Sequence, residues 1–276
     1  MTKMQKVLDN GVQHVELLEG IEDNDGGITV QMTEPMDPSI FVTVLRASLT
    51  LWKKQKKKGV WIKLPIELVN LVEPAVKEGF WYHHAETRYL MLVYWIPNTT
   101  PKLPANASHR VGIGAFVMNN NGEVLVVQEN KGKFKGTGIW KLPTGAVNEG
   151  EDISAAAVRE VKEETGIESE FLEVLAFRQS HNSFFSKSDI FFICLLRPLS
   201  FDIQKQDSEV EAAQWMAIGD YTAQPFVQQK QIFNQIAKIC LERANDKYSG
   251  LSPVLTTSGF SAKKFYLYFN NQSGSS

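Results

Sequence analysis

Two blocks of periodic hydrophobic positions are separated by a polar stretch rich in Pro, Thr, Asn and Ser, PNTTPKLPANAS at residues 97–108. In the first block, alternating apolar positions predict strands, and apolar positions three and four apart predict helices. Asp37 followed by Pro38 is typical of a helix start. The block therefore predicts the order strand, helix, strand, helix, strand, strand, at residues 26–32, 37–58, 59–65, 66–80, 81–86 and 89–97.

The second block opens with two strand patterns around the turn NNNG, which predicts a β-hairpin over residues 109–129. A short strand at 139–145 precedes a helix at about 151–165, where Gly166 is a natural stop. The rest of the block predicts three strands and a final helix, at residues 171–181, 189–198, 209–218 and 226–243.

These patterns divide the chain into five segments. We expect a flexible N-terminus at 1–24, an α/β domain at 25–98, a linker at 99–108, a second domain at 109–245 and a C-terminal tail at 246–276. His83 and His84 adjoin each other in a predicted strand, so they are expected to face opposite ways.

Charge and composition limit the kinds of molecule that the protein is expected to bind. The formal charge is −2 and the pI is about 6.2, so no basic field favours bulk nucleic acid or an anionic membrane. The longest apolar run, YLMLVYWI, is too short to span a bilayer, and the N-terminus has no apolar core of signal-peptide length. Cys194 and Cys240 make no metal-ligand pair and suit reduced thiols. We expect a cytoplasmic protein that acts on a small molecule.

The helix predicted at 151–165 places three carboxylates on one face. Glu160, Glu163 and Glu164 are spaced three and four residues apart, so their like charges repel. Either the face is solvated, or it holds a divalent cation such as Mg²⁺, which prefers oxygen ligands. The opposite face is an apolar stripe made by Ile153, Ala156, Ala157 and Val161.

Residues around this helix can complete such a site. Gly145 closes the preceding strand and can offer its carbonyl where no Cβ intervenes. Arg159 lies two helical turns from Glu151 and can pair with it, and it can also hold Glu160 in one rotamer.

Together these positions match a known motif. The chain resembles the Nudix box, G-x5-E-x7-R-E-U-x-E-E-x-G-U, over about residues 104–240. The defined positions of the box are filled by Gly145, Glu151, Arg159, Glu160, Val161, Glu163, Glu164, Gly166 and Ile167. Further stretches resemble the plant Nudix group that cleaves ADP-ribose and NADH and carries an N-terminal pre-Nudix domain: KKGVWIKLP, EGFWYHHAE, YLMLVYWIP, LPANASHRVGIGAFV, EVLVVQE, WKLPTG and VLAFRQSH.

The resemblance implies an α/β (α+β) fold: a Nudix α/β/α sandwich with a mixed sheet, preceded by a smaller acetyltransferase-like α/β domain. It also implies hydrolysis of a nucleoside diphosphate derivative with Mg²⁺ or Mn²⁺. Glu160 and Glu164 are the implied metal ligands, Glu163 a third, and the Gly145 carbonyl a further contact. ADP-ribose would give AMP and ribose 5-phosphate, and NADH would give AMP and reduced nicotinamide mononucleotide.

The general base and the substrate contacts stay open at this point. The stretch KQDSEVEAAQW offers Asp207, Glu209 and Glu211 as bases, of which we favour Glu209 because a loop before a strand can deliver a carboxylate. An ordinary polar turn is the alternative for all three. Candidate substrate-binding residues are Lys141, Trp140, Phe134 and Arg178.

Three alternatives remain. The SQPWPFPxS marker of one NADH-cleaving Nudix class and the coenzyme A signature are both absent. Neither absence excludes the plant-type activity, but both leave the leaving group open, so coenzyme A, FAD and an oxidised nucleotide are alternative substrates. A sensor that binds a nucleotide and regulates a protein partner is a second reading, although the intact glutamates argue against lost catalysis. An acyltransferase is a third, but HRVGIGA continues into a hairpin instead of opening a helix. We expect a homodimer in which the first domain supports dimerisation or shapes the substrate entrance.

Overall fold

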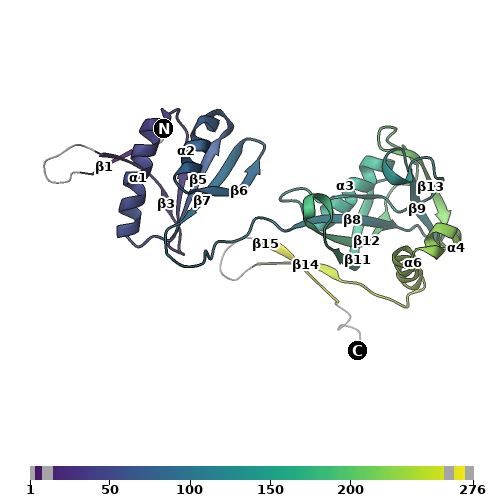
Figure 1. Cartoon of the computed structure of the whole chain (residues 1–276). Coiled ribbons are helices and arrows are strands. Elements are labelled where there is room, and N and C mark those ends of the chain that lie inside the picture. Colours follow the sequence, from purple (N-terminus) through teal and green to yellow (C-terminus); the bar gives the residue numbers. More distant parts are fainter. Residues whose placement is uncertain (1–3, 8–14, 258–263, 271–276) are drawn as a thin grey trace. The chain divides into compact units, whose positions relative to one another are not determined.

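The structure is a computed structural model that describes residues 4–7, 15–257 and 264–270. The chain forms two compact units, residues 1–107 and 108–276 (Figure 1). Each unit has its own hydrophobic core, as the predicted linker between them requires.

The N-terminal unit contains a five-stranded sheet with the order β3-β4-β5-β7-β6. The strand pair β4–β5 is parallel, and the other neighbours are antiparallel. Its strands are β3 (Ile21–Glu22), β4 (Ile28–Gln31), β5 (Gly59–Pro65), β6 (Trp81–Glu86) and β7 (Tyr89–Trp95). Strands β4 to β7 agree with the strands predicted from the first block, whereas β3 lies in the segment that was predicted to be flexible.

Helix α1 (Pro38–Lys54) and the segment η1 (Ile66–Leu71) with α2 (Val72–Lys77) share one core with this sheet. Asp37 caps α1, because its side chain accepts the backbone N–H of Ser39 at 2.8 Å, as predicted. The helix predicted at 66–80 is instead a 3₁₀ segment followed by a short α-helix.

The N-terminus was predicted to be flexible, but its described residues contain paired strands. Strand β1 (Met4–Val7) pairs with β2 (Val15–Leu18), and Leu17 and Leu18 are buried. The backbone N–H of Leu18 donates to Ser48 Oγ on α1 at 2.9 Å. Packing against a distant helix orders this segment, and local periodicity carries no sign of it.

The prediction that His83 and His84 face apart is wrong. A β-bulge shifts the register of β6 against β7 between Tyr82 and His84, and the two Nδ1 atoms lie 2.7 Å apart. A bulge breaks the alternation on which the prediction depended.

The C-terminal unit contains a four-stranded mixed sheet with the order β10-β8-β12-β11, in which only β8 and β12 run parallel. A second, two-stranded sheet pairs β9 with β13. The strands are β8 (His109–Val117), β9 (Glu123–Glu129), β10 (Thr144–Ala146), β11 (Ser169–Ser180), β12 (Ser188–Pro198) and β13 (Val210–Ala217).

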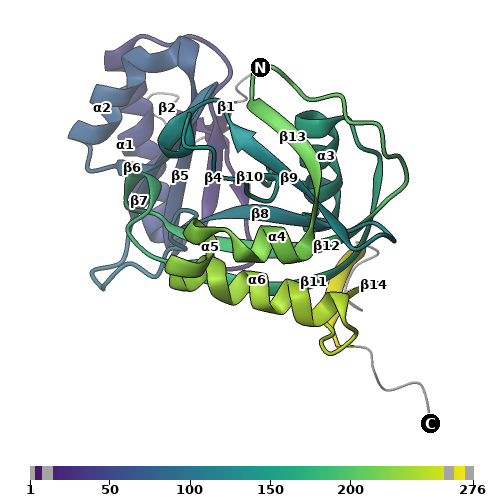
Figure 2. The same cartoon turned by 90° about the vertical axis from the view of Figure 1, so that its right-hand side faces the viewer.

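Helices cover both faces of the mixed sheet, which gives the predicted α/β/α sandwich (Figure 2). Helix α3 (Ile153–Thr165) packs on one face and α6 (Gln231–Ala244) on the other, with α4 (Ile218–Ala223) and α5 (Pro225–Gln229) beside α6. Alternate residues of β8 supply the two cores: Ile113 and Ala115 pack toward α3, and Phe116 packs toward α6.

Three local predictions need correction. The turn at 119–122 forms, but β8 and β9 diverge into different sheets and share only the bridge between Met118 and Val124. The strand predicted at 139–145 shrinks to β10, and the final helix breaks at Lys230 into α5 and α6. The predicted tail contains a hairpin of β14 (Ser252–Thr257) and β15 (Lys264–Phe269).

Among the described residues, no helix is both long and apolar enough to cross a membrane. Cys194 and Cys240 are buried free thiols, and burial raises the pKa of both to about 12.

Candidate metal centre

Helix α3 has a defined start, a defined end and a buried side. Asp152 occupies its N-cap position with an extended backbone, and Gly166 ends it with φ 74°, in the left-handed region that favours glycine. The Gly166 N–H donates to Lys162 O at 2.8 Å. The predicted stripe packs inward, with Ala156, Ala157 and Val161 fully buried. The polar face of α3 therefore has a defined position beside the edge strand β10.

Gly145 and Glu160 meet where β10 passes α3. Gly145 lies opposite Ile113 in the antiparallel pair β10–β8. A Cβ at Gly145 would overlap the carboxylate of Glu160, so only glycine leaves room for this contact. The backbone of β10 and a carboxylate of α3 are thus brought into direct contact.

Arg159 organises the acidic residues around it. Its Nε donates to Glu151 Oε1 at 2.7 Å, and one Nη donates to both Glu160 Oε1 at 2.8 Å and Glu163 Oε2 at 2.9 Å. The other Nη donates to Glu151 Oε2 and to Ala146 O, each at 2.9 Å. The pairs of Arg159 with Glu151 and Glu160 agree with prediction. The guanidinium thus connects α3 to β10 and to the loop before α3.

These contacts perturb the acids in opposite directions. Hydrogen bonds from Arg159, with a further one from the backbone of Asn148, lower the pKa of Glu151 to about 2. Burial raises the pKa of Glu160, although Arg159 opposes that shift. The pKa of the Arg159 guanidinium is raised further, chiefly by its bonds to Glu151.

Glu164 is the most buried acid of the group, with 7% of the residue exposed. Burial raises its pKa to about 7 against the opposing charge of Lys141. Among the residues that the structure describes, its Oε1 accepts only a long bond of 3.4 Å from the Thr144 N–H, and its buried Oε2 has no hydrogen-bond partner. An unpartnered buried carboxylate oxygen fits a site for a cation or a proton.

The donor set fits a hard divalent cation once Glu163 rotates. In the described part of the chain, no three acidic, histidine or cysteine side chains converge as a finished metal site. Arg159 instead holds both Glu160 and Glu163. The side chain of Glu163 is 52% exposed, so it can leave Arg159 freely. Oxygen ligands from Glu160, Glu164 and the Gly145 carbonyl are of the type that Mg²⁺ and Mn²⁺ prefer.

Lys141 lies beside these carboxylates and is held by two partners. It pairs with Glu129 and donates to Thr144 Oγ1 at 2.9 Å. Its charge lowers the pKa of Glu164, which places the ammonium group close to that acid. Sequence reasoning had not singled out Glu129, which is simply the last residue of β9.

The charge of Glu209 contributes to the raised pKa of both Glu160 and Glu164, which indicates that Glu209 lies near the glutamates of α3. Asp207, by contrast, pairs with Lys205, and Glu211 lies on β13 next to the β-bulge at that strand's start. Of the three carboxylates offered by this loop, the structure connects Glu209 electrostatically with the predicted ligands.

The remaining predicted substrate contacts lie against other elements. Trp140 exchanges hydrogen bonds with the Gln224 side chain, and Phe134 makes an edge-on contact with Phe226 of α5. Arg178 pairs with Asp189 and stacks over Phe191, a residue of the core that faces α6. The structure does not join these three to the glutamates.

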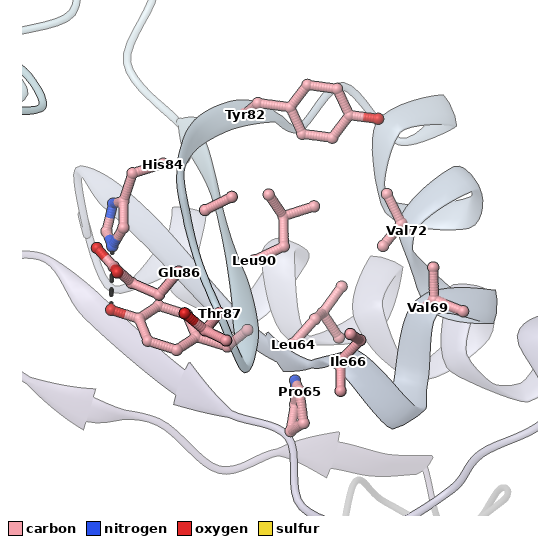
Figure 3. Close-up of a pocket in the computed structure, with 12 residues that line it drawn as sticks. Leu64, Pro65, Ile66, Val69, Val72, Tyr82, His84, Glu86, Thr87 and Leu90 are labelled. Carbon is pink, nitrogen blue, oxygen red and sulfur yellow. Dashed lines mark hydrogen bonds between the residues drawn. The ribbon is translucent and has the colours of Figure 1, made fainter. Parts of the chain in front are cut away.

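The N-terminal unit contains a separate apolar pocket of about 550 Å³. Figure 3 shows it between the β6–β7 hairpin and the η1–α2 segment, where Leu90, Val69 and Val72 face Tyr82. His84 and Glu86 lie at its rim, and His84 Nε2 is 3.2 Å from Tyr89 Oη. Its lining contains no arrangement comparable with the glutamates of α3.

Fold and site together define a class of protein: an α/β/α sandwich with a cluster of glutamates at the edge of its mixed sheet, which is a candidate cation site. Comparison with known proteins identifies the family to which this fold and site belong. A NUDIX domain profile matches residues 108–235, and a profile described as a Nudix hydrolase domain matches residues 18–96. The chain belongs to the Nudix hydrolase family.

Its relatives match both units. Nudix hydrolase 2 of Arabidopsis thaliana is 60% identical over 86% of this chain and 86% of its own length. Nudix hydrolase 10 of the same plant is 56% identical over 99% of this chain and 97% of its own. The human protein named nucleoside diphosphate-linked moiety X motif 6 is 37% identical over 74% of this chain and 66% of its own. The predicted resemblance to plant Nudix hydrolases is confirmed.

Proposed function

We propose that this chain hydrolyses the diphosphate of ADP-ribose, NADH or both, with Mg²⁺ or Mn²⁺ as cofactor. The products are AMP with ribose 5-phosphate, or AMP with reduced nicotinamide mononucleotide. Membership of the family supports the reaction type, and the similarity of the quoted stretches to the plant group supports the choice of substrates. The buried free thiols suit a cytoplasmic location.

One observation carries the proposal. The Glu164 carboxylate is buried, and one of its oxygens has no hydrogen-bond partner in the described part of the chain. It lies next to Lys141 and in the same polar cluster as Glu160. Burying an unpaired carboxylate is costly unless a cation or proton compensates it. A solvated acidic face would leave all three glutamates exposed, which is true of Glu163 alone.

The chain's own residues have distinct parts in the reaction. Glu160, Glu164 and the Gly145 carbonyl would hold the cation, and Glu163 would be a further ligand once it is free of Arg159. A bound divalent cation neutralises charge on the diphosphate and lowers the pKa of the attacking water. Arg159 orients Glu160 through a bond of 2.8 Å. Lys141 offers an ammonium group to a phosphate oxygen from a position fixed by Glu129 and Thr144.

Glu209 is our proposed general base. Its carboxylate accepts a proton from the attacking water, and its position on a loop lets it approach the water from outside α3. Trp140, Phe134 and Arg178 remain proposed substrate contacts. Because they lie away from the glutamates of α3, a bound nucleotide must extend across the edge of the sheet to reach them, or their side chains must move.

The test is a steady-state panel of ADP-ribose, NADH, FAD, coenzyme A and 8-oxo-dGTP with Mg²⁺ or Mn²⁺, with Glu164→Gln beside the wild type. We expect metal-dependent AMP release from ADP-ribose or NADH, and a loss of at least about 100-fold in the variant. Cleavage of another compound alone would overturn the substrate assignment. Metal binding without turnover of any compound would favour a sensor that acts through a protein partner.

A further inference from the structure

The loop that carries Glu209, residues 204–209, is tied to the C-terminal end of α3. The Gln204 N–H donates to Thr165 O at 2.8 Å, and the Gln206 N–H donates to Glu164 O at 3.0 Å. These bonds satisfy carbonyl groups that the end of a helix leaves open. We name residues 204–209 the Glu209 loop. Two of its N–H groups therefore hold the loop against the end of α3, where Glu164 carries the buried carboxylate.

Asn130 holds the opposite side of the Glu209 loop. It directly follows β9, and its side-chain Nδ2 donates to Asp207 O at 2.7 Å. Its backbone N–H donates to Glu209 O at 3.4 Å. Asn130 therefore binds the carbonyl groups of Asp207 and Glu209, on either side of Ser208, while α3 accepts the N–H groups of Gln204 and Gln206.

The chemistry of this contact requires an amide side chain. A carbonyl oxygen only accepts, so the atom facing Asp207 O must be the Asn130 nitrogen. The other amide atom, Oδ1, is buried and has no hydrogen-bond partner in the described structure. Burying an amide oxygen without a hydrogen-bond partner is unfavourable unless the other bonds of the side chain serve the structure around it.

We propose that Asn130 is a positioning residue for Glu209: it fixes the Glu209 loop so that the Glu209 carboxylate faces Glu160 and Glu164. This inference rests on the proposed function, because Glu209 acts there as the base. Asn130 touches no reacting atom. Asn130 acts through its hydrogen bonds to the Asp207 and Glu209 carbonyl groups. These bonds fix the backbone of the loop and so set the direction in which the Glu209 side chain points.

Asn130→Asp is the sharpest variant, because it keeps the shape and replaces the donor with an acceptor that faces the Asp207 carbonyl. We expect kcat for the best substrate of the panel to fall about tenfold, with KM within about twofold, since substrate contacts are untouched. Asn120→Asp, in an exposed turn, is the matched control for the change of charge and should keep wild-type kinetics.

A double-mutant cycle tests whether the effect passes through Glu209. Asn130→Asp in a Glu209→Gln background should lower kcat by less than about twofold further. Equal losses in both backgrounds would overturn the proposal, and so would wild-type kcat in Asn130→Asp. A Glu209→Gln variant with full activity would overturn it as well.

Amide hydrogen exchange separates this inference from the proposed function. In the chain without nucleotide, Asn130→Asp should speed exchange at the Gln206, Glu209 and Val210 amides at least about tenfold, while Asn120→Asp leaves them unchanged. If exchange is faster in Asn130→Asp but the wild type cleaves no compound of the panel, the proposed function is refuted and the anchoring of the Glu209 loop by Asn130 stands. Unchanged exchange in Asn130→Asp would overturn that anchoring whatever the activity.

Discussion

The carboxylate of Glu160 lies against the Cα of Gly145, in space that any side chain at position 145 would fill. The glycine belongs to the edge strand β10 and the glutamate to α3. The contact between the backbone of β10 and the Glu160 carboxylate therefore depends on the absence of a Cβ at position 145.

Gly145→Ala should displace Glu160 and lower kcat by about 100-fold, because a shift of about 1 Å in a ligand is enough for such a loss. The measurement is metal-dependent AMP release. Gly219→Ala is the control, since a Cβ there meets open space and the backbone needs no left-handed angle. Wild-type kcat in Gly145→Ala would show that the position of Glu160 is unimportant.

Arg159→Ala should lower the free energy of unfolding by about 2 kcal/mol, because it leaves Glu151 and Glu160 partly buried without their cation. Urea denaturation measures this loss, and CD at low denaturant shows whether the variant is folded. Arg197→Ala, which breaks an exposed pair with Glu170, should cost less than about 0.5 kcal/mol. Similar losses in both variants would contradict the special role of Arg159.

The Glu151 pair should stabilise the fold in a defined pH range. Arg159 lowers the Glu151 pKa from its ordinary value of 4.5 to about 2, so the folded state favours the carboxylate. The resulting stability is fully present above pH 4.5 and is lost as the pH falls toward 2. Glu151→Gln should remove that part of the acid dependence in urea titrations between pH 5 and 2. An unchanged slope would mean that other acids produce it.

Glu164 should behave in the opposite way. Burial raises its pKa from 4.5 to about 7, so the metal-free fold loses stability as the pH rises through this interval. Glu164→Gln should therefore raise the stability of the metal-free chain at pH 8, by at least about 1 kcal/mol.

The same group should couple Mn²⁺ binding to proton release. A ligand must be deprotonated, so the affinity for Mn²⁺ should rise with pH up to about 7 and then level off. Calorimetry in buffers of different ionisation enthalpy should detect about one proton released at pH 6 and none from this group at pH 8.5. A proton count independent of pH would contradict the assignment of Glu164.

The fragment 108–276 should fold without the N-terminal unit, because the two units have separate cores. We expect one cooperative thermal transition. If the first unit supports dimerisation or shapes the substrate entrance, the fragment should differ from the full chain in light scattering or in KM. A fragment with the same oligomeric state and full activity would refute both roles.

The sequence alone determined the parts of the site that depend on local spacing. A helix turn of 3.6 residues dictates that Glu160, Glu163 and Glu164 lie close together and that Arg159 can reach Glu151. The stop at Gly166 and the cap at Asp37 follow equally from neighbouring residues. Most strands of both units were predictable for the same reason, since alternation is a local pattern.

Only the tertiary structure decided which of these residues are buried and what lies opposite them. Local pattern gave no sign that β8 and β9 enter different sheets, or that Glu164 is buried while Glu163 is exposed. The contact of Asn130 with Asp207 joins residues 77 positions apart in the chain. Such contacts depend on how sheets and helices pack, and packing sums weak preferences over the whole chain, so no short stretch of sequence encodes them.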